Sequence, residues 1–382
     1  MRSIARGLLG VVAFVLLACA ASPALAHGLA DDAPLATPPK PAPPRKAINL
    51  TISTSGDILI HKALWEHALD YGGGTTYNFR PLFRQVRPYI AGADLALCHL
   101  ETPLMQGDPV GFPVFRTPPA LARAIKATGW DVCTTASNHT LDHGQEGINS
   151  TIAALRRSGV RATGSARSFG ESRRIPILKA KGVKVAFLGY TQLLNGQTAP
   201  HPWSVNMAEP EAIIADAKRA RRRGAKVVIV NIHWGVEFAR EPSAEQMALA
   251  TRLARSSAIT AVVGEHAHVV QPIRRVGGKL VVFGQGNLIA NQGSYADLAP
   301  ESRDGIVSLL RIRISKQGKD QLRRVDYVPV FVSEDDFTVL PVGRLLRQQK
   351  DAASPLLETS WQRTLGTIGR GRAYGPWSRP KP

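Results

Sequence analysis

Side chains that can bind metal ions follow five apolar runs of the sequence. They are Asp57 in TSGDILIH, Glu101 in LCHLET, Asn138 and His139 in TTASNHTLD, His233 in VNIHWG, and His266 and His268 in VVGEHAHVV. In an open α/β sheet, ligands bind beyond the carboxyl ends of the strands. A single histidine in such a place is more often a hydrogen-bonded structural residue than a ligand. Five strand ends with carboxylate, amide and imidazole donors together predict a site for two metal ions.

The elements that would position these residues alternate between strands and helices. Short apolar runs rich in β-branched residues predict strands at 49–54, 95–99, 132–136, 183–189, 227–232, 260–263 and 280–283. Start and stop signals predict helices from Pro118 to Gly129, from Gln145 to Gly159, and from Pro210 to Gly224. Two later segments, 306–314 and 325–332, alternate in part and predict added antiparallel strands. This order predicts an α/β fold built of βαβ units.

The N-terminal segment has the pattern of an export signal. Arg2 and Arg6 precede an apolar stretch from Leu8 to Ala18, and small residues end at Ala26, which predicts a signal peptide over residues 1–26. The stretch is short for a membrane span, which disfavours a permanent anchor helix. The run LLAC that ends at Cys19 also resembles a lipobox, so a lipid anchor on Cys19 is the alternative to cleavage. We expect an exported protein, periplasmic or extracellular, that is either free or attached to the membrane through Cys19.

The rest of the chain divides into three segments. Proline-rich residues 27–46 predict a semi-extended linker and residues 47–335 the folded domain. Residues 336–382 predict a basic tail, and their weak periodicity is compatible with disorder. Cys98 and Cys133 each lie in an apolar run, and two thiols do not make a disulfide framework. We therefore favour buried free thiols over a bridge between neighbouring strands.

The formal net charge of +19 raises nucleic-acid binding as a function class. Arg219 and the run from Arg221 to Arg223 form a local cluster that could meet phosphates. The sequence around them shows no recognition helix, zinc finger or aromatic-basic RNA motif. We interpret the cluster as a solvated helix end and expect no nucleic-acid partner. A basic surface also suits an anionic polymer or an anionic membrane.

Six ordered motifs resemble the CapA family of poly-gamma-glutamate capsule biosynthesis proteins, a branch of the calcineurin-like metallophosphoesterases. The motifs are GDILIH, HLETPL, ASNHTLDHGQEGI, IHWGVEF, GEHAHVVQPI and FGQGNLI, and they lie between Asn49 and Asn291. The resemblance implies a metallophosphoesterase-like αββα sandwich, with two mixed β-sheets flanked by helices. It also implies a metal-dependent hydrolase, a metallophosphatase. In such an enzyme a hydroxide bridging two divalent ions of manganese, iron or zinc attacks an anionic substrate, either a phosphoester or poly-gamma-glutamate.

The resemblance also implies a role for each motif residue. Glu101 would be shared by both ions. Asp57 and His268 would bind the first ion, and Asn138, His233 and His266 would bind the second. His139 would address the substrate, and Asp142 would either orient its imidazole or cap a helix. His61 is an alternative ligand of the first ion, because Leu59 stands where the superfamily often has a histidine.

Four further residues are weaker candidates for substrate contacts: Arg116, Trp234, Glu237 and Asn287. Each has a structural alternative, namely a surface arginine, a packed tryptophan, a solvated glutamate, and an asparagine that stabilises a turn or orients a ligand. The alternative function is a capsule or exopolymer binding or export factor without catalysis, in which the metals would be structural.

Overall fold

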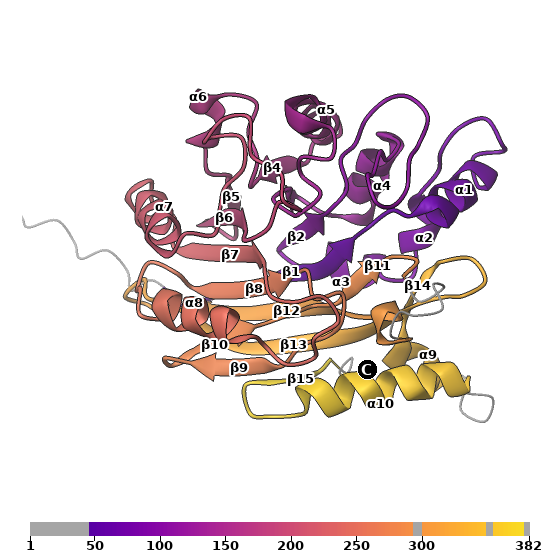
Figure 1. Cartoon of the computed structure of the whole chain (residues 1–382). Coiled ribbons are helices and arrows are strands. Elements are labelled where there is room, and N and C mark those ends of the chain that lie inside the picture. Colours follow the sequence, from indigo (N-terminus) through magenta and orange to yellow (C-terminus); the bar gives the residue numbers. More distant parts are fainter. Residues whose placement is uncertain (1–45, 293–299, 349–353, 378–382) are drawn as a thin grey trace, which may run out of the picture. The chain divides into compact units, whose positions relative to one another are not determined.

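A computed structural model of the chain describes residues 46–292, 300–348 and 354–377. The expected signal peptide at 1–26, which includes Cys19, and residues 27–45 of the expected linker lie outside the described residues. In the described ranges, no helix combines the length and the apolar composition that crossing a membrane requires. Most of the described residues form two β-sheets and the helices that cover them (Figure 1).

The first sheet combines a parallel half with an antiparallel half. Its strands are, in spatial order, β14 (Val339–Pro341), β13 (Asp320–Val332), β12 (Asp304–Ile314), β1 (Ile48–Ile58), β2 (Leu95–Leu100), β3 (Val132–Thr134) and β4 (Arg161–Thr163), with β11 (Asn287–Ile289) beside β1 and β15 (Tyr374–Pro376) beside β13. β1 to β4 run parallel, whereas β12 runs antiparallel to β1. The predicted added strands at 306–314 and 325–332 are therefore confirmed as β12 and β13.

The second sheet is parallel at its centre and antiparallel at both edges. Its strands are, in spatial order, β5 (Ile177–Ala180), β6 (Val183–Thr191), β7 (Val227–His233), β8 (Ala261–Glu265), β10 (Lys279–Val282) and β9 (Ile273–Val276). Every residue of β7, VVIVNIH, is buried. A continuous β-branched run of this kind is typical of a central strand that is covered on both faces.

The helices form two outer layers (Figure 1). Those beside the first sheet are α1 (Lys62–Asp70), α2 (Arg80–Phe83), α3 (Arg87–Ala91), α4 (Ala120–Thr128) and α5 (Gly144–Arg157), and those beside the second are α7 (Pro210–Arg222) and α8 (Ala244–Ala254). The others are α6 (Phe169–Ser172), η1 (Pro300–Arg303), α9 (Val342–Gln348) and α10 (Pro355–Ile368). Helix α4 ends at Gly129, as predicted, because this residue has a left-handed φ of 119°. A Cβ there would lie 2.8 Å from the Cβ of Ala91, so glycine ends the helix.

Three clusters of buried apolar side chains hold these layers together. One joins the first sheet to α1 through α5 and includes Leu64. The second contains residues of both sheets, such as Ile52 and Ile229, and therefore lies between them. The third joins the other face of the second sheet to α7 and α8 through Ile213 and Leu253. The order helix, sheet, sheet, helix confirms the predicted αββα sandwich with two mixed sheets.

The segment after residue 335, predicted as a basic tail that could be disordered, contributes ordered elements in its described part. β14 and β15 both pair with β13, and Leu357 of α10 packs against Phe331 and Val342. The expectation failed because α10 buries only a few of its side chains, Leu357, Ser360, Thr364 and Ile368. A stripe with two hydroxyl residues gives a weak apolar period in the sequence.

Cys98 and Cys133 form a disulfide, so the expectation of free thiols was wrong. β2 and β3 are adjacent parallel strands, and their register places Cys98 directly beside Cys133, with the two Cα atoms 4.5 Å apart. This register follows from the packing of the sheet and cannot be read from the spacing of two cysteines.

The disulfide should stabilise the fold mainly by restricting the unfolded chain. Its cysteines are 35 residues apart, and a loop of this size predicts a contribution of about 3 to 4 kcal/mol to the free energy of unfolding. The double substitution Cys98→Ala and Cys133→Ala should lower the denaturant midpoint accordingly in non-reducing buffer. A non-reducing peptide map that contains the two cysteines as separate free thiols would contradict the bridge.

Candidate metal centre

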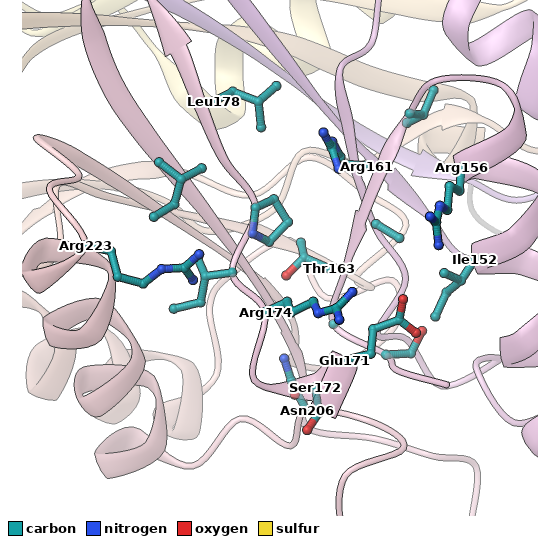
Figure 2. Close-up of a pocket in the computed structure, with 17 residues that line it drawn as sticks. Ile152, Arg156, Arg161, Thr163, Glu171, Ser172, Arg174, Leu178, Asn206 and Arg223 are labelled. Carbon is teal, nitrogen blue, oxygen red and sulfur yellow. The ribbon is translucent and has the colours of Figure 1, made fainter. Parts of the chain in front are cut away.

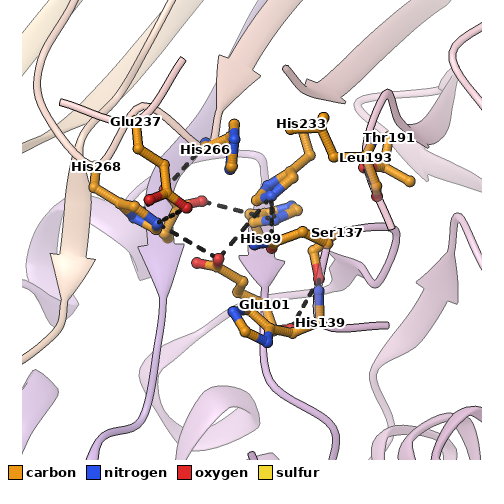
Figure 3. Close-up of polar contacts among 12 residues, drawn as sticks. His99, Glu101, Ser137, His139, Thr191, Leu193, His233, Glu237, His266 and His268 are labelled. Atoms are coloured by element: carbon orange, nitrogen blue, oxygen red, sulfur yellow. Dashed lines mark hydrogen bonds and ion pairs between the residues drawn. The ribbon is translucent and has the colours of Figure 1, made fainter. Parts of the chain in front are cut away.

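Side chains from the ends of parallel strands in both sheets converge at one place, as Figure 3 shows. Among the described residues, four overlapping groups could hold a metal ion, and the ligand atoms of each group lie within 4.8 Å of one another. The groups are Asp57 with His99 and His233, Glu101 with His233 and His266, Glu237 with His266 and His268, and Asp57 with Glu101 and His268. Five of the six residues predicted as ligands therefore lie together. The sixth, Asn138, joins them through its Oδ1, which lies 3.0 Å from Nε2 of His233.

The backbone at these strand ends has unusual local geometry. Gly56 lies so close to the chain at Gly286 that a Cβ would be 1.9 Å from the carbonyl oxygen of Gly286, and Asp57 N–H donates to that oxygen. Only glycine allows β1 and the segment before β11 to approach in this way. His266 and His268 have φ values of 90° and 55°, in the left-handed region that residues other than glycine rarely adopt. Backbone strain of this kind occurs most often at functional sites.

Several buried polar atoms at the centre have no hydrogen-bond partner among the described residues and are suited to binding a cation. Both carboxylate oxygens of Glu101, Oδ1 of Asp57 and Nδ1 of His266 are buried and have no hydrogen-bond partner among the described residues. Burial raises the pKa of Glu101 well above its usual range, and the charge of Asp57 adds to this effect. A buried carboxylate without hydrogen bonds is costly unless a positive charge compensates it. The donor set therefore fits divalent metal ions.

His233 points an unprotonated nitrogen toward the centre. Burial, together with the neighbouring His266, lowers the pKa of His233 well below its usual value, so the ring is neutral. Its Nδ1 lies 3.0 Å from Nε2 of His99. When Nδ1 donates its proton to His99, Nε2 faces Oδ1 of Asn138 at 3.0 Å and Oε1 of Glu101 at 4.0 Å. Three lone pairs directed at one point are repulsive to one another and favour a cation between them.

His99 was missed in the sequence, although the structure places it at the centre. Its Nδ1 lies 2.7 Å from Oγ1 of Thr134 and 3.2 Å from Oδ1 of Asn231, so Nδ1 carries the proton that Asn231 accepts. Its Nε2 then accepts from His233 and lies 3.7 Å from Oδ1 of Asp57. The signal was present in LCHLET, because His99 and Glu101 are two residues apart on a strand and therefore face the same side.

Glu265, the last residue of β8, was also missed. It is a buried carboxyl group whose Oε1 accepts from Nδ2 of Asn231 and from Nε2 of Gln285. Burial and the charge of Asp57 raise the pKa of Glu265 well above its usual range. Because Asn231 also contacts His99, Glu265 fixes the amide of Asn231 and, through it, the ring of His99.

Asp142 contacts His139 and does not cap a helix. Its Oδ2 lies 2.9 Å from Nδ1 of His139 and also accepts from the backbone N–H of Phe115. Helix α5 begins at Gly144, its N-terminal cap is His143, and no side chain caps it. Figure 3 shows His139 beside Glu101, and the edge of the Phe115 ring packs against His139. Nδ1 of His139 is thus held by a carboxylate, which leaves Nε2 for a substrate.

Asn287 and Glu237 lie next to His268. Oδ1 of Asn287 is 3.0 Å from Nδ1 of His268, and its Nδ2 donates to Gln292 and to the carbonyl of Ser302. Asn287 is fully buried, so it orients a predicted ligand. Glu237 was predicted as a substrate contact, but its Oε1 lies 4.0 Å from Nε2 of His268 and it belongs to one of the four groups. Its half-exposed side chain lies where the centre meets solvent.

Three predicted residues are placed differently. The prediction that Trp234 contacts a substrate is wrong, because Trp234 is fully buried. Its Nε1 donates to the backbone carbonyl of Phe283, and its ring stacks on the Phe283 ring. Arg116 pairs through its backbone with Val110, and its side chain lies beside Gly107. His61 belongs to none of the four metal-ligand groups found among the described residues. Burial lowers its pKa to about 4, and its Nδ1 contacts the backbone N–H of Asn291.

The proton on His268 should make the stability of the metal-free protein depend on pH. Burial disfavours the charged ring, but the charges of Glu101 and Asp57 outweigh burial and raise the pKa of His268 from 6.5 to about 10. A raised histidine pKa contributes stability that is complete below about pH 6.5 and is lost as the pH rises through about 10. We expect the melting temperature of metal-free protein to fall over this window, and to fall less in His268→Gln. Equal slopes in the two proteins would contradict this assignment.

Comparison with known proteins agrees with this fold. The family model described as "Bacterial capsule synthesis protein PGA_cap" matches residues 51–292. "Capsule biosynthesis protein CapA" of Bacillus anthracis is 29% identical over 265 residues, which cover 66% of this chain and 62% of that protein. "PGA biosynthesis protein CapA" of Bacillus subtilis is 25% identical over 315 residues, covering 81% of this chain and 78% of that one. The match thus spans less than two thirds of the length of the Bacillus anthracis relative.

A solved structure is similar in fold. The calcineurin-like phosphoesterase YfkN of Bacillus subtilis superposes with a TM-score of 0.50 and 16% sequence identity, over 82% of this chain and 99% of that chain. At this identity the likeness concerns the fold alone. Because the family model covers more than half of the sequence, the chain belongs to the bacterial capsule synthesis (PGA_cap) family, and it has the fold of the calcineurin-like metallophosphoesterases.

Proposed function

We propose that this protein is an exported hydrolase that uses two divalent metal ions to cleave a phosphoester or a related anionic substrate of the cell envelope. The observation that carries the proposal is the buried meeting of two carboxylates, Asp57 and Glu101, with three imidazoles. Both oxygens of Glu101, Oδ1 of Asp57 and one imidazole nitrogen there have no hydrogen-bond partner among the described residues. Two adjacent groups that share a carboxylate suit two ions close together. The fold of a phosphoesterase supports the same class of reaction.

Most residues of the centre would bind the metal ions, and His139 would transfer a proton. Asp57, Glu101, Asn138, His233, His266 and His268 would hold the ions. Manganese, iron and zinc all suit such mixed oxygen and nitrogen donors. Two bound cations neutralise charge on the oxygens of the substrate and lower the pKa of a water to near neutrality. His139, held at Nδ1 by Asp142, would donate a proton from Nε2 to the leaving oxygen.

The test is a hydrolysis assay on aryl phosphate mono- and diesters. Protein stripped with a chelator and reconstituted with manganese, iron or zinc should turn over at least one of these esters. The stripped protein should not. Equal rates for the reconstituted wild type and for a variant without Glu101 would show that hydrolysis, if present, does not occur at this centre.

Export is the second part of the proposal. The signal-like pattern of residues 1–26 supports it, and so does the disulfide, because such bonds persist mainly in exported proteins. Mass spectrometry of the mature N-terminus should find a cleaved chain, either free after Ala26 or lipidated on Cys19. An intact Met1 on protein from the cytoplasmic fraction would contradict export.

A second candidate function is a non-catalytic factor that binds or exports a capsule polymer. The relatives are named for capsule and PGA biosynthesis, which favours this class over a general phosphatase. Here the metals would be structural. Polymer binding that persists in the stripped protein, without turnover in the reconstituted one, would favour this candidate.

A further inference from the structure

A short loop beside the metal centre carries apolar side chains that face solvent. Residues 110–115 read VGFPVF and contain no polar side chain, and we call them the apolar loop. Of the seven large apolar residues that are exposed in the described part of the chain, three are Val110, Phe112 and Val114. Two backbone hydrogen bonds between Val110 and Arg116 close the loop. Isolated apolar residues are normal on a surface, but a cluster of them marks a place where an apolar ligand or partner binds.

Ring contacts hold the apolar loop next to the imidazole that faces the substrate. The buried ring of Phe115 packs at right angles to His139, with 4.7 Å between the ring centroids. The ring of Phe112, which is 71% exposed, lies 6.5 Å from that of Phe115. The backbone N–H of Phe115 donates to Asp142, the carboxylate that also holds His139. The exposed side chains of the loop are therefore fixed on the His139 side of the centre.

The position of His139 indicates which part of a substrate would meet the apolar loop. In the proposed hydrolysis, a water oxygen forms the new bond to phosphorus and the bond from phosphorus to the ester oxygen breaks. His139 donates the proton of Nε2 to that ester oxygen, so an alcohol is released. The proton that the attacking water loses replaces the one that His139 gave. The carbon chain of the alcohol therefore begins beside His139, on the side where the apolar loop lies.

A second exposed side chain at the centre has a different chemistry. Figure 3 shows Glu237 beside His268 and apart from His139. The Oε1 of Glu237 lies 4.0 Å from Nε2 of His268, and covering this carboxylate with hydrocarbon is costly. The apolar loop instead gains from such a cover, because its exposed valines and phenylalanine lose contact with water. An aliphatic group is thus favoured on the His139 side.

We propose that the anionic ligand of the centre carries a long aliphatic chain, as in the phosphoester of a lipid alcohol, and that the apolar loop binds this chain. The proposal rests on the proposed function, because the role of His139 there places the alcohol beside the loop. It narrows the substrate class to amphiphiles with a phosphate at one end. Each methylene that the loop covers should tighten binding by roughly two- to fourfold.

The experiment measures the binding of butylphosphonate and octylphosphonate to the manganese-loaded, full-length protein by calorimetry, below their micelle concentrations. Their carbon–phosphorus bond is not cleaved by this hydrolysis, so the measurement does not depend on turnover. Octylphosphonate should bind at least about tenfold more tightly than butylphosphonate. Phe112→Ser should reduce this ratio at least about threefold, since the ring no longer covers the chain. Val110→Thr with Val114→Thr, which keeps the branched shape, is the second variant if Phe112→Ser fails to fold.

The matched control is Phe169→Ser, which removes the same side chain from another place on the surface. Phe169 is 61% exposed and is the first residue of α6. Glu171 and Ser172 of this helix line a separate cavity of about 410 Å³, which Figure 2 shows. None of the residues that line this cavity belongs to the metal-ligand groups of the described residues. Phe169→Ser should therefore leave the ratio of the two affinities unchanged.

Three results would overturn the proposal. Equal affinities for the two phosphonates would exclude a site for the chain, and an equal loss in Phe169→Ser would show unspecific attraction of the chain to the surface. Binding to phosphatidylglycerol vesicles that depends on Phe112, with equal affinities for the two phosphonates, would make the apolar loop a membrane contact. A preference for the longer chain that depends on Phe112, without hydrolysis of octyl or aryl phosphate, would instead support the ligand class and contradict the proposed hydrolysis.

Discussion

Replacing Glu101 by glutamine should remove bound metal and lower turnover at least about 10³-fold. Glu101 belongs to two of the four overlapping groups, and both of its oxygens are buried without a hydrogen-bond partner among the described residues. Glutamine keeps the shape but replaces one oxygen by an NH₂ group, whose hydrogens repel a cation. The measurement is metal content by mass spectrometry together with kcat for an aryl phosphate.

The same substitution should not unfold the metal-free protein. Burial raises the pKa of Glu101 because it makes the charged carboxylate costly, so a neutral amide removes that cost from the metal-free protein. The melting temperature of Glu101→Gln in chelator should therefore equal or exceed that of the wild type. Glu241→Gln is the matched control, because Glu241 is exposed and paired with Arg274, and it should keep full metal content and turnover. Full metal content in Glu101→Gln would contradict the role of this carboxylate.

Replacing His139 by alanine should lower kcat by about 10² to 10⁴ while metal content remains unchanged. His139 belongs to none of the metal-ligand groups of the described residues, and Asp142 holds its Nδ1. The loss should therefore appear in proton transfer to the leaving group, so an ester with a better leaving group should be less affected. Loss of metal together with activity would instead make His139 a ligand.

Asp142→Asn is the companion to this variant. An amide in place of the carboxylate can still contact Nδ1 of His139, but it no longer stabilises a charged ring. The loss in kcat should be smaller than in His139→Ala, at about 10- to 100-fold. Unchanged kcat in Asp142→Asn would show that Asp142 has only a structural role, as the acceptor for the backbone N–H of Phe115.

The sequence predicted the elements that carry strong local patterns. β6, β7, β8 and β10 lie within a few residues of the predicted runs, because a strand buried on both faces is continuously apolar. α4 and α5 follow their proline and glycine signals. α8 was missed although Ser243 and Gln246 form a capping box, because the short helix carries no wide apolar stripe.

Site residues could be predicted where the residue type alone indicates metal binding. They could not be predicted where the position along a strand determines which side chains face the site. Asp57, Glu101, the histidine that ends β7 and the two histidines after β8 are metal donors at strand ends, and the structure brings them together. His99 stands inside a strand, and only its spacing from Glu101 places both on one face. Trp234 was misassigned because the residue after a strand end can turn either to the site or to the core.

The most direct test of the account is anomalous X-ray scattering from crystals of the manganese-loaded protein. We expect two peaks among these side chains, one beside Asp57 and His268 and the other beside His233 and His266, with Glu101 next to both. A crystal that shows no peak between these side chains, while the protein in solution binds manganese, would contradict it.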